Sequence, residues 1–400
     1  MSKRPLNFIC VSTYFKGEDF IKQCKAEGNN VFLLTMKKLE HENWPWESID
    51  DVFYIDKWNE NEIIKGLAYK YRSLKFDRFV ALDDFDVENV AAIREHFRMP
   101  GMGSTTSRYF RDKLAMRIKA KEEGVNVPEF TPLFNDTDIN NYADYVSPPW
   151  LLKPRSEASA AGIKKIHSKE ELWQVVHSLE DERDDFLIEK FAPGDVYHVD
   201  GLNVGGKVVF SRVSKYLDTP FEVAHGGGIF RSATCKIDSK IEKTLSKMNA
   251  EVMKAFGMQF GASHTEFIAS KATGELFFLE TSSRVGGANL AEMVAFASGV
   301  NLWSEWARIE SDTLKNKKYI LPKIQDKYAG IVVSLSRFEY PDTSSFTDKE
   351  IVWRMHKPWH IGIIVVSDSS ERVLELLDKY TNRIANEFHA SSPAPDTLRD

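Results

Sequence analysis

Two glutamates, Glu266 and Glu280, constrain this chain of 400 residues more than any other feature. The segment 261–284 has the pattern of two strands joined by a short turn at 271–274. If the hairpin is symmetric about Thr273, the two glutamates lie directly opposite each other on the same face. Their repulsion is roughly 3 kcal/mol at about 5 Å and an effective dielectric near 20, which destabilises the sheet.

A cation between the two carboxylates removes this repulsion. Hard divalent ions such as Mg²⁺ suit paired carboxylates and usually bring substrate phosphates with them. The same register places His264 opposite Ser282, and the other face of the hairpin is expected to pack into the core through Thr265, Phe267, Phe277 and Leu279. The hairpin therefore predicts a magnesium site, and the alternative interpretation is a solvated surface hairpin.

Length and composition narrow the class of protein. The chain is long enough for two or three domains with substantial cores. Its net charge of −6 does not favour a nucleic-acid or anionic-membrane partner. Three scattered cysteines without metal-ligand spacing suit a reducing compartment. Because we find neither a signal peptide nor a run of about 18 apolar residues, we expect a cytoplasmic protein.

The order of predicted elements indicates an α/β (α+β) protein in three parts. Residues 1–105 form a small α/β domain with strands at 7–12, 30–35 and 78–83 and helices at 18–27 and 86–98. It lacks G-x-G-x-x-G, so a dinucleotide site is not expected, and no other chemistry is visible in it. Residues 106–312 begin with a helix over 108–123, capped by the Ser/Thr cluster at 104–107, and continue with strands at 149–153, 186–191, 196–204 and 207–213 and a helix at 287–298.

Residues 313–400 form a small C-terminal α+β segment with strands at 328–336 and 360–366 and a helix at 370–387. The tail beyond residue 390 is rich in Ser, Pro and Ala and is expected to be disordered.

If the two glutamates hold Mg²⁺ on a nucleotide, several other residues are candidates for binding the same nucleotide. Lys113 and Lys153 are placed to donate charge to phosphates, although a lone lysine is most often a solvated side chain. The loop 155–163 consists mainly of small residues whose backbone amides can close over phosphates, and a plain turn is the alternative. Glu189, at the end of a strand, can take ribose hydroxyls. The planar fork of Arg284 fits a phosphoryl or acyl-phosphate oxygen.

In order and spacing, these motifs resemble the ATP-grasp superfamily. The residues that carry the resemblance are Asp112-Lys113, Lys153-Pro-Arg, Glu189-Lys190-Phe-Ala, His198-Val-Asp200 and Glu266…Glu280-Thr-Ser-Ser-Arg284. The resemblance covers about residues 1–390 and is closest to the branch of biotin carboxylase, carbamoyl-phosphate synthetase and L-amino acid ligase. It implies a pre-ATP-grasp domain over 1–105 and an ATP-grasp domain over 106–312, with a lid subdomain at about 113–187.

The resemblance also implies roles for individual residues. Lys113 and Lys153 would contact the phosphates of ATP, and Arg284 with Lys153 would act in phosphoryl transfer. The metal, Mg²⁺ or Mn²⁺ in its place, would be held by Glu266, Glu280 and Ser282, where the family usually has Asn in place of this serine. The remaining contacts to the nucleotide would come from Glu189, Lys190, Ala192, His198 and Ile268.

The implied reaction is ATP-dependent ligation of a small carboxylate to an amine through an acyl phosphate. Two alternatives remain open: a bicarbonate-activating enzyme of the carboxylase or carbamoyl-phosphate type, and an ATP-binding regulatory protein without turnover. The glycine-rich segment 221–231 would line the substrate pocket, with His225 and Arg231 binding a carboxylate, or it would be a mobile hairpin tip. The resemblance is compatible with a homodimer.

Overall fold

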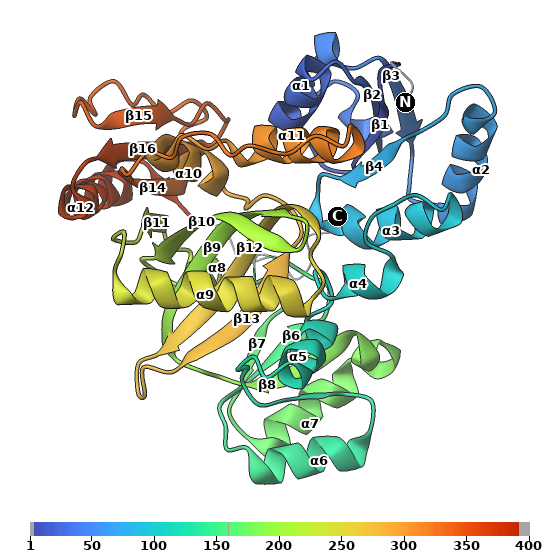
Figure 1. Cartoon of the computed structure of the whole chain (residues 1–400). Helices are drawn as coiled ribbons and strands as arrows, with labels where there is room; N and C mark the ends of the chain where they lie inside the picture. Colours follow the sequence, from blue (N-terminus) through green and yellow to red (C-terminus); the bar gives the residue numbers. More distant parts are fainter. Residues whose placement is uncertain (1–3, 159, 392–400) are drawn as a thin grey trace.

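The computed structural model describes residues 4–158 and 160–391, and in these ranges it contains three sheets (Figure 1). The first sheet is parallel, with the strand order β3-β2-β1-β4. Its strands are β1 (Asn7–Ser12), β2 (Asn30–Met36), β3 (Asp51–Ile55) and β4 (Arg78–Ala81). The helices α1 (Glu18–Ala26), α2 (Glu60–Tyr71) and α3 (Val87–His96) cover it. Successive residues of β1 alternate between two apolar clusters, one with α1 and one with α2 and α3, so both faces of this sheet are buried.

The central sheet has nine strands and is antiparallel throughout, in the order β13-β12-β9-β10-β11-β14-β16-β15, with β17 also paired to β14. Its strands are β9 (Gly194–Val204), β10 (Lys207–Tyr216), β11 (Phe230–Thr234), β12 (Phe260–Ser270), β13 (Leu276–Ser282), β14 (Tyr328–Ser336), β15 (Ile351–Arg354), β16 (His360–Ser367) and β17 (His389–Ala390). The helices of this region are α8 (Pro220–Gly226), α9 (Lys240–Ala255), α10 (Leu290–Ser298), α11 (Leu302–Leu314) and α12 (Ser370–Glu387).

The small sheet is antiparallel, in the order β5-β8-β6-β7, and lies at the bottom of Figure 1 with its two helices. Its strands are β5 (Phe130–Pro132), β6 (Trp150–Pro154), β7 (Lys164–Ile166) and β8 (Phe186–Lys190), and its helices are α6 (Asp136–Tyr145) and α7 (Lys169–Ser178). The helices α4 (Ser104–Arg108) and α5 (Lys113–Glu122) precede it. The described residues also contain the 3-10 turns η1 (Lys37–Leu39), η2 (Trp46–Ser48), η3 (Asp84–Asp86) and η4 (Glu180–Asp185).

The predicted mixed α/β fold and the predicted strands are confirmed, with small shifts at their ends. The single helix predicted over 108–123 is wrong, because the chain forms α4 and α5 with a break between them. Asp112 causes this break: its side chain accepts hydrogen bonds from the backbone N–H groups of Leu114 and Ala115, so α5 begins at Lys113. The predicted disordered tail lies almost entirely outside the described residues.

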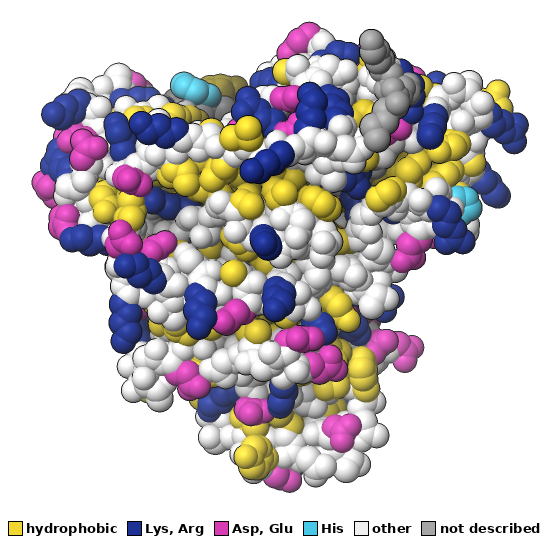
Figure 2. All heavy atoms as spheres, viewed as in Figure 1, with side chains coloured by type: hydrophobic (Ala, Val, Ile, Leu, Met, Phe, Trp, Pro, Cys, Tyr) yellow, Lys and Arg dark blue, Asp and Glu magenta, His cyan; other side chains and the backbone are white. Residues whose placement is uncertain are grey.

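The surface in Figure 2 shows acidic and basic side chains interspersed over one face of the molecule. Within the described ranges, no helix is both long enough and apolar enough to span a bilayer.

Gly261 shows how closely α11 packs on the central sheet. This residue of β12 has φ 114°, and a Cβ atom there would lie 2.8 Å from Nε1 of Trp306 on α11. We expect Gly261→Ala to lower the free energy of unfolding by at least about 2 kcal/mol, because it adds both backbone strain and a clash.

Gly66→Ala is the matched control for urea denaturation. Gly66 lies on the exposed side of α2, and a Cβ atom added there would have nothing within 4 Å, so alanine should raise stability by about 0.5–1 kcal/mol. Equal stability of the two variants would contradict the packing argument.

Candidate functional site

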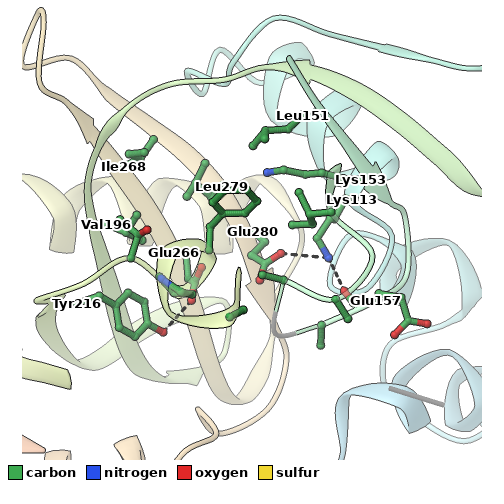
Figure 3. A pocket seen from close by; sticks show the side chains of 18 of the residues that line it. Lys113, Leu151, Lys153, Glu157, Val196, Tyr216, Glu266, Ile268, Leu279 and Glu280 are labelled. Carbon is green, nitrogen blue, oxygen red and sulfur yellow. Dashed lines mark hydrogen bonds and ion pairs between the residues drawn. The ribbon is translucent and has the colours of Figure 1, made fainter. Parts of the chain in front are cut away.

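A cavity of about 490 Å³ lies between the small sheet and the central sheet (Figure 3). The small sheet contributes residues of β6 and β8, and the central sheet contributes residues of β9, β12 and β13. The predicted site residues that line this cavity are Lys113, Lys153, Glu189, Lys190, Ala192, Glu266, Ile268, Glu280, Ser282 and Arg284. The fold thus brings together in one place ten residues that are spread over more than 170 positions of the chain.

The predicted register of the hairpin is confirmed. Glu266 pairs with Glu280, and His264 pairs with Ser282. Between these two pairs, the hydroxyl groups of Thr265 and Thr281 lie 2.8 Å apart in a hydrogen bond that links the strands. The two carboxylates therefore face the cavity side by side, as Figure 3 shows.

The prediction for the opposite face of the hairpin is partly wrong, because the register shifts by one residue after Glu266. This bulge leaves Leu279 without a partner and places Phe278, rather than Phe277, beside Phe267 in the core. Leu279 turns instead to the cavity, where its side chain gathers with those of Leu151, Val196 and Ile268 (Figure 3). These side chains form an apolar part of the cavity wall.

Glu266 has two partners inside the protein. The hydroxyl of Tyr216 donates a hydrogen bond of 2.8 Å to its Oε1, and Nε2 of His264 lies 3.6 Å from the same atom. Burial alone would raise the pKa of Glu266, but His264 and Tyr216 lower it below its usual value. Burial likewise opposes a charged imidazole, yet Asp200 and Glu266 raise the pKa of His264 to about 9.

Behind Glu266 lies a buried chain of hydrogen bonds. The carboxylate of Asp200 accepts from Nδ1 of His264 at 2.8 Å and from Nδ1 of His198 at 2.7 Å, while Nε2 of His198 contacts the Ser232 hydroxyl at 2.8 Å. His198, Asp200 and His264 are close enough to hold a metal ion, but these hydrogen bonds already use the same atoms. His198 is fully buried and does not line the cavity, so the structure places it behind the site that was predicted to include it.

Lys113 forms an ion pair with Glu280, the second glutamate of the hairpin. It is the first residue of α5, and its Nζ lies 3.2 Å from Oε2 of Glu280 and also donates to the backbone oxygen of Glu157 (Figure 3). The side chain of Lys113 is only 9% exposed. Its ammonium is therefore fixed at the cavity wall beside a candidate metal ligand.

A second charged cluster consists of Glu189, Lys153 and Arg117. The sequence analysis did not identify Arg117 as a site residue. Lys153 pairs with Oε1 of Glu189, and Arg117 donates from Nε and Nη2 to Oε2 at 3.0 and 2.8 Å. Burial would raise the pKa of Glu189, but the charges of Arg117 and Lys153 lower it from 4.5 to about 2. Arg117 also donates to the backbone oxygen of Leu279 at the bulge, so it links the small sheet to the hairpin. The predicted contact of Glu189 with ribose stays a prediction.

Arg284 meets a carboxylate from the N-terminal sheet. Its Nη2 lies 3.4 Å from Oδ2 of Asp84, and Nη1 of Arg111 lies 3.7 Å from the same oxygen. Burial would raise the pKa of Asp84, but Arg284, Arg111 and Ser282 lower it. Asp84 lies in residues 1–105, where the sequence shows no chemistry, and it lines the cavity.

His225 and Arg231 are not brought to this cavity. The segment 221–231 forms most of α8 and the start of β11 rather than a hairpin tip. His225 contacts the backbone oxygens of Phe221 and Ile163 at 3.0 and 3.1 Å. Arg231 lines a separate hollow and is paired with Asp218 and Asp378. Its guanidinium is thus already neutralised by two carboxylates.

Comparison with known proteins agrees with this geometry. Residues 146–292 match the family described as ATP-grasp domain. An L-arginine-specific L-amino acid ligase of Bacillus subtilis is 25% identical over 261 residues, which are 64% of this chain and 62% of that protein. A D-alanine-D-alanine ligase of Neisseria gonorrhoeae is 24% identical over 204 residues, which are 50% of this chain and 66% of that protein. The matches thus span slightly less than two thirds of each relative.

The whole fold also has a solved counterpart. The crystal structure of an L-amino acid ligase from Bacillus licheniformis superposes with a TM-score of 0.78 at 17% identity, covering 97% of this chain and 99% of that chain. At this identity the likeness concerns the fold alone.

The charges around Glu189 predict a pH-dependent stability. Because the pKa of Glu189 is lowered from 4.5 to about 2, its ion pairs stabilise the fold fully above about pH 4.5, and this stability is lost as the pH falls toward 2. We expect Arg117→Met to cost about 3–5 kcal/mol at pH 7, because it leaves a buried carboxylate with one partner. The variant should also lose less additional stability than the parent between pH 4.5 and pH 3.

Urea denaturation at pH 7, 4.5 and 3 measures both effects. Arg108→Met is the control, because the Arg108 side chain is 65% exposed and its change should stay within about 0.5 kcal/mol at each pH. An Arg117→Met variant with the same pH dependence as the parent would contradict the assigned charges.

Proposed function

Because residues 146–292 belong to the ATP-grasp domain family, we propose that this protein is an ATP-dependent ligase that joins a small carboxylate to an amine. One observation carries the proposal: two directly opposed glutamates face a cavity that two buried lysines and an arginine also line. The named relatives are amino acid ligases, which favours amino acids as substrates.

The residues present fit Mg-ATP. Glu266 and Glu280 offer carboxylate oxygens of the kind that Mg²⁺ prefers, and Ser282 adjoins them with its hydroxyl. Lys113 and Lys153 would neutralise phosphate oxygens. The apolar side chains of Leu151, Val196, Ile268 and Leu279 would enclose the base, with Lys190 and Ala192 at the same end. When bound, Mg-ATP supplies the phosphoryl group and the charge of the metal.

The chain's own residues would then position the reactants, which is the main source of catalysis in phosphoryl transfer. An oxygen of the substrate carboxylate bonds to the γ-phosphorus while the bond to the bridging oxygen breaks, so ADP leaves. Arg284, which lines the same cavity, would hold the oxygens of the resulting acyl phosphate with its planar fork. The amine nitrogen then bonds to the acyl carbon, the carbon–oxygen bond to phosphate breaks, and the nitrogen gives up a proton.

The direct test is ADP release from Mg-ATP with single amino acids, pairs of amino acids and bicarbonate. Release that requires a carboxylate and an amine together, with an amide product identified by mass spectrometry, supports the proposal. Release with bicarbonate alone would contradict it and favour the carboxylase type of activity.

A substitution in the hairpin tests the metal site. We expect Glu280→Ala to lower the rate of ADP release by at least about 100-fold, because Glu266 alone leaves the metal with one carboxylate. Mn²⁺ and Mg²⁺ titrations should show weaker metal binding in the variant.

Glu275→Ala is the matched control on the same hairpin. Glu275 is exposed at the turn, where it accepts a hydrogen bond from Asn126, so its loss should leave turnover within twofold. Full activity of Glu280→Ala would refute the assignment of the metal site.

A further inference from the structure

Tyr216 and His264 both contact the same oxygen of Glu266. The hydroxyl of Tyr216 donates a hydrogen bond of 2.8 Å to Oε1, and Nε2 of His264 lies 3.6 Å from that atom (Figure 3 shows the tyrosine contact). Both side chains line the cavity beside the carboxylate. Within the described ranges the partners of Glu266 thus meet Oε1, and Oε2 remains for a ligand in the cavity.

The hydroxyl of Tyr216 is fixed in its place. Tyr216 is the last residue of β10 and is only 5% exposed. Its ring packs against the rings of His198 and Phe230, with centroid distances of 4.7 and 5.7 Å. His198 is itself held by hydrogen bonds to Asp200 and to Ser232. The hydroxyl therefore cannot leave Glu266 without a rearrangement of buried side chains.

His264 is anchored through its other ring nitrogen. Its Nδ1 lies 2.8 Å from Oδ1 of Asp200, a fully buried carboxylate whose second oxygen contacts His198. This anchor keeps Nε2 of His264 near Oε1 of Glu266. Tyr216 and His264 come from the adjoining strands of the central sheet, so this sheet restrains one of the two oxygens.

Glu280 is restrained less than Glu266. Its contact is to Lys113, which lies on α5 outside the central sheet and is expected to neutralise phosphate oxygens when a nucleotide binds. The side chain of Glu280 is 35% exposed, compared with 15% for Glu266. The restraint by a neutral hydroxyl is therefore particular to Glu266.

The number of free carboxylate oxygens affects which cation a site prefers. A carboxylate can bind a cation through one oxygen or through both. Mg²⁺ requires nearly octahedral geometry and keeps several water or phosphate oxygens, whereas Ca²⁺ accepts six to eight oxygens, including both oxygens of one carboxylate. A glutamate with one engaged oxygen therefore suits Mg²⁺ better than Ca²⁺.

On the premise of the proposed function, which requires a metal nucleotide, we propose that Tyr216 restricts Glu266 to one metal-binding oxygen and thereby favours Mg²⁺ over Ca²⁺. Tyr216 is a positioning residue in this scheme, because it acts through Glu266 and does not itself bind the metal. His264, anchored by Asp200, supports the same restriction.

The test measures metal binding, which needs no turnover. Mn²⁺ is titrated into the protein with ADP, followed by electron paramagnetic resonance, and then displaced by Mg²⁺ or by Ca²⁺, with ADP alone as the reference. Tyr216→Phe removes the hydroxyl and keeps the packed ring, so the variant should fold. We expect the affinity for Ca²⁺ relative to Mg²⁺ to rise at least about fivefold, because both oxygens of Glu266 become available.

Tyr197→Phe is the matched control. Tyr197 lies on β9, pairs with Phe267 of β12 and is not among the described residues that line the cavity, so the ratio of the two affinities should stay within twofold of the parent's. An unchanged ratio in Tyr216→Phe, or an equal loss of affinity for both ions, would show that Tyr216 only packs against the hairpin and would overturn the inference.

The same experiment separates this inference from the proposed function. A parent protein that binds no Mn²⁺ with ADP would overturn the metal site and the inference together. A parent that binds the metal nucleotide, with the expected change of ratio in Tyr216→Phe, but forms no amide would support the role of Tyr216 and contradict only the proposed ligation.

Discussion

The opposition of Glu266 and Glu280 is the constraint on which the rest of the site depends. Two like charges in a directly opposed pair destabilise the hairpin by mutual repulsion. In this structure each carboxylate has its own hydrogen-bond or ion-pair partners. Glu266 is held by Tyr216 and His264, and Glu280 by Lys113. These partners belong to three different elements, so the folded chain fixes the carboxylates from several directions.

Arg117 extends this arrangement from the hairpin to the small sheet. Its guanidinium reaches both Glu189 and the backbone oxygen of Leu279, while Glu189 holds Lys153. Lys153 on the small sheet and the hairpin strand β13 are thereby connected through one buried side chain. Because the three charges lie in a nearly dry environment, removing one of them leaves a charge without compensation, which is far more costly than losing a surface ion pair.

Local patterns predict part of this structure well. The register of Glu266 and Glu280 follows from the alternation of strand side chains about a short turn, and the apolar strand before Lys153 follows from composition. The bulge at Leu279 leaves no local signal, because one unpaired residue does not change the apolar pattern. Arg117 was equally hidden, since its partners lie 72 and 162 positions away in the sequence.

The N-terminal sheet shows most clearly why site prediction from motifs stops short. This sheet has no glycine-rich turn and therefore no recognisable motif. Nevertheless, the loop after β4 contributes Asp84 to a cavity that is formed mainly by the other two sheets. The contribution of Asp84 then depends on Arg111 and Arg284, which have no local relation to it. An ion pair that crosses between two sheets couples the charge at Arg284 to their relative position. Any shift between these sheets therefore changes the electrostatic environment of Arg284, which lines the cavity.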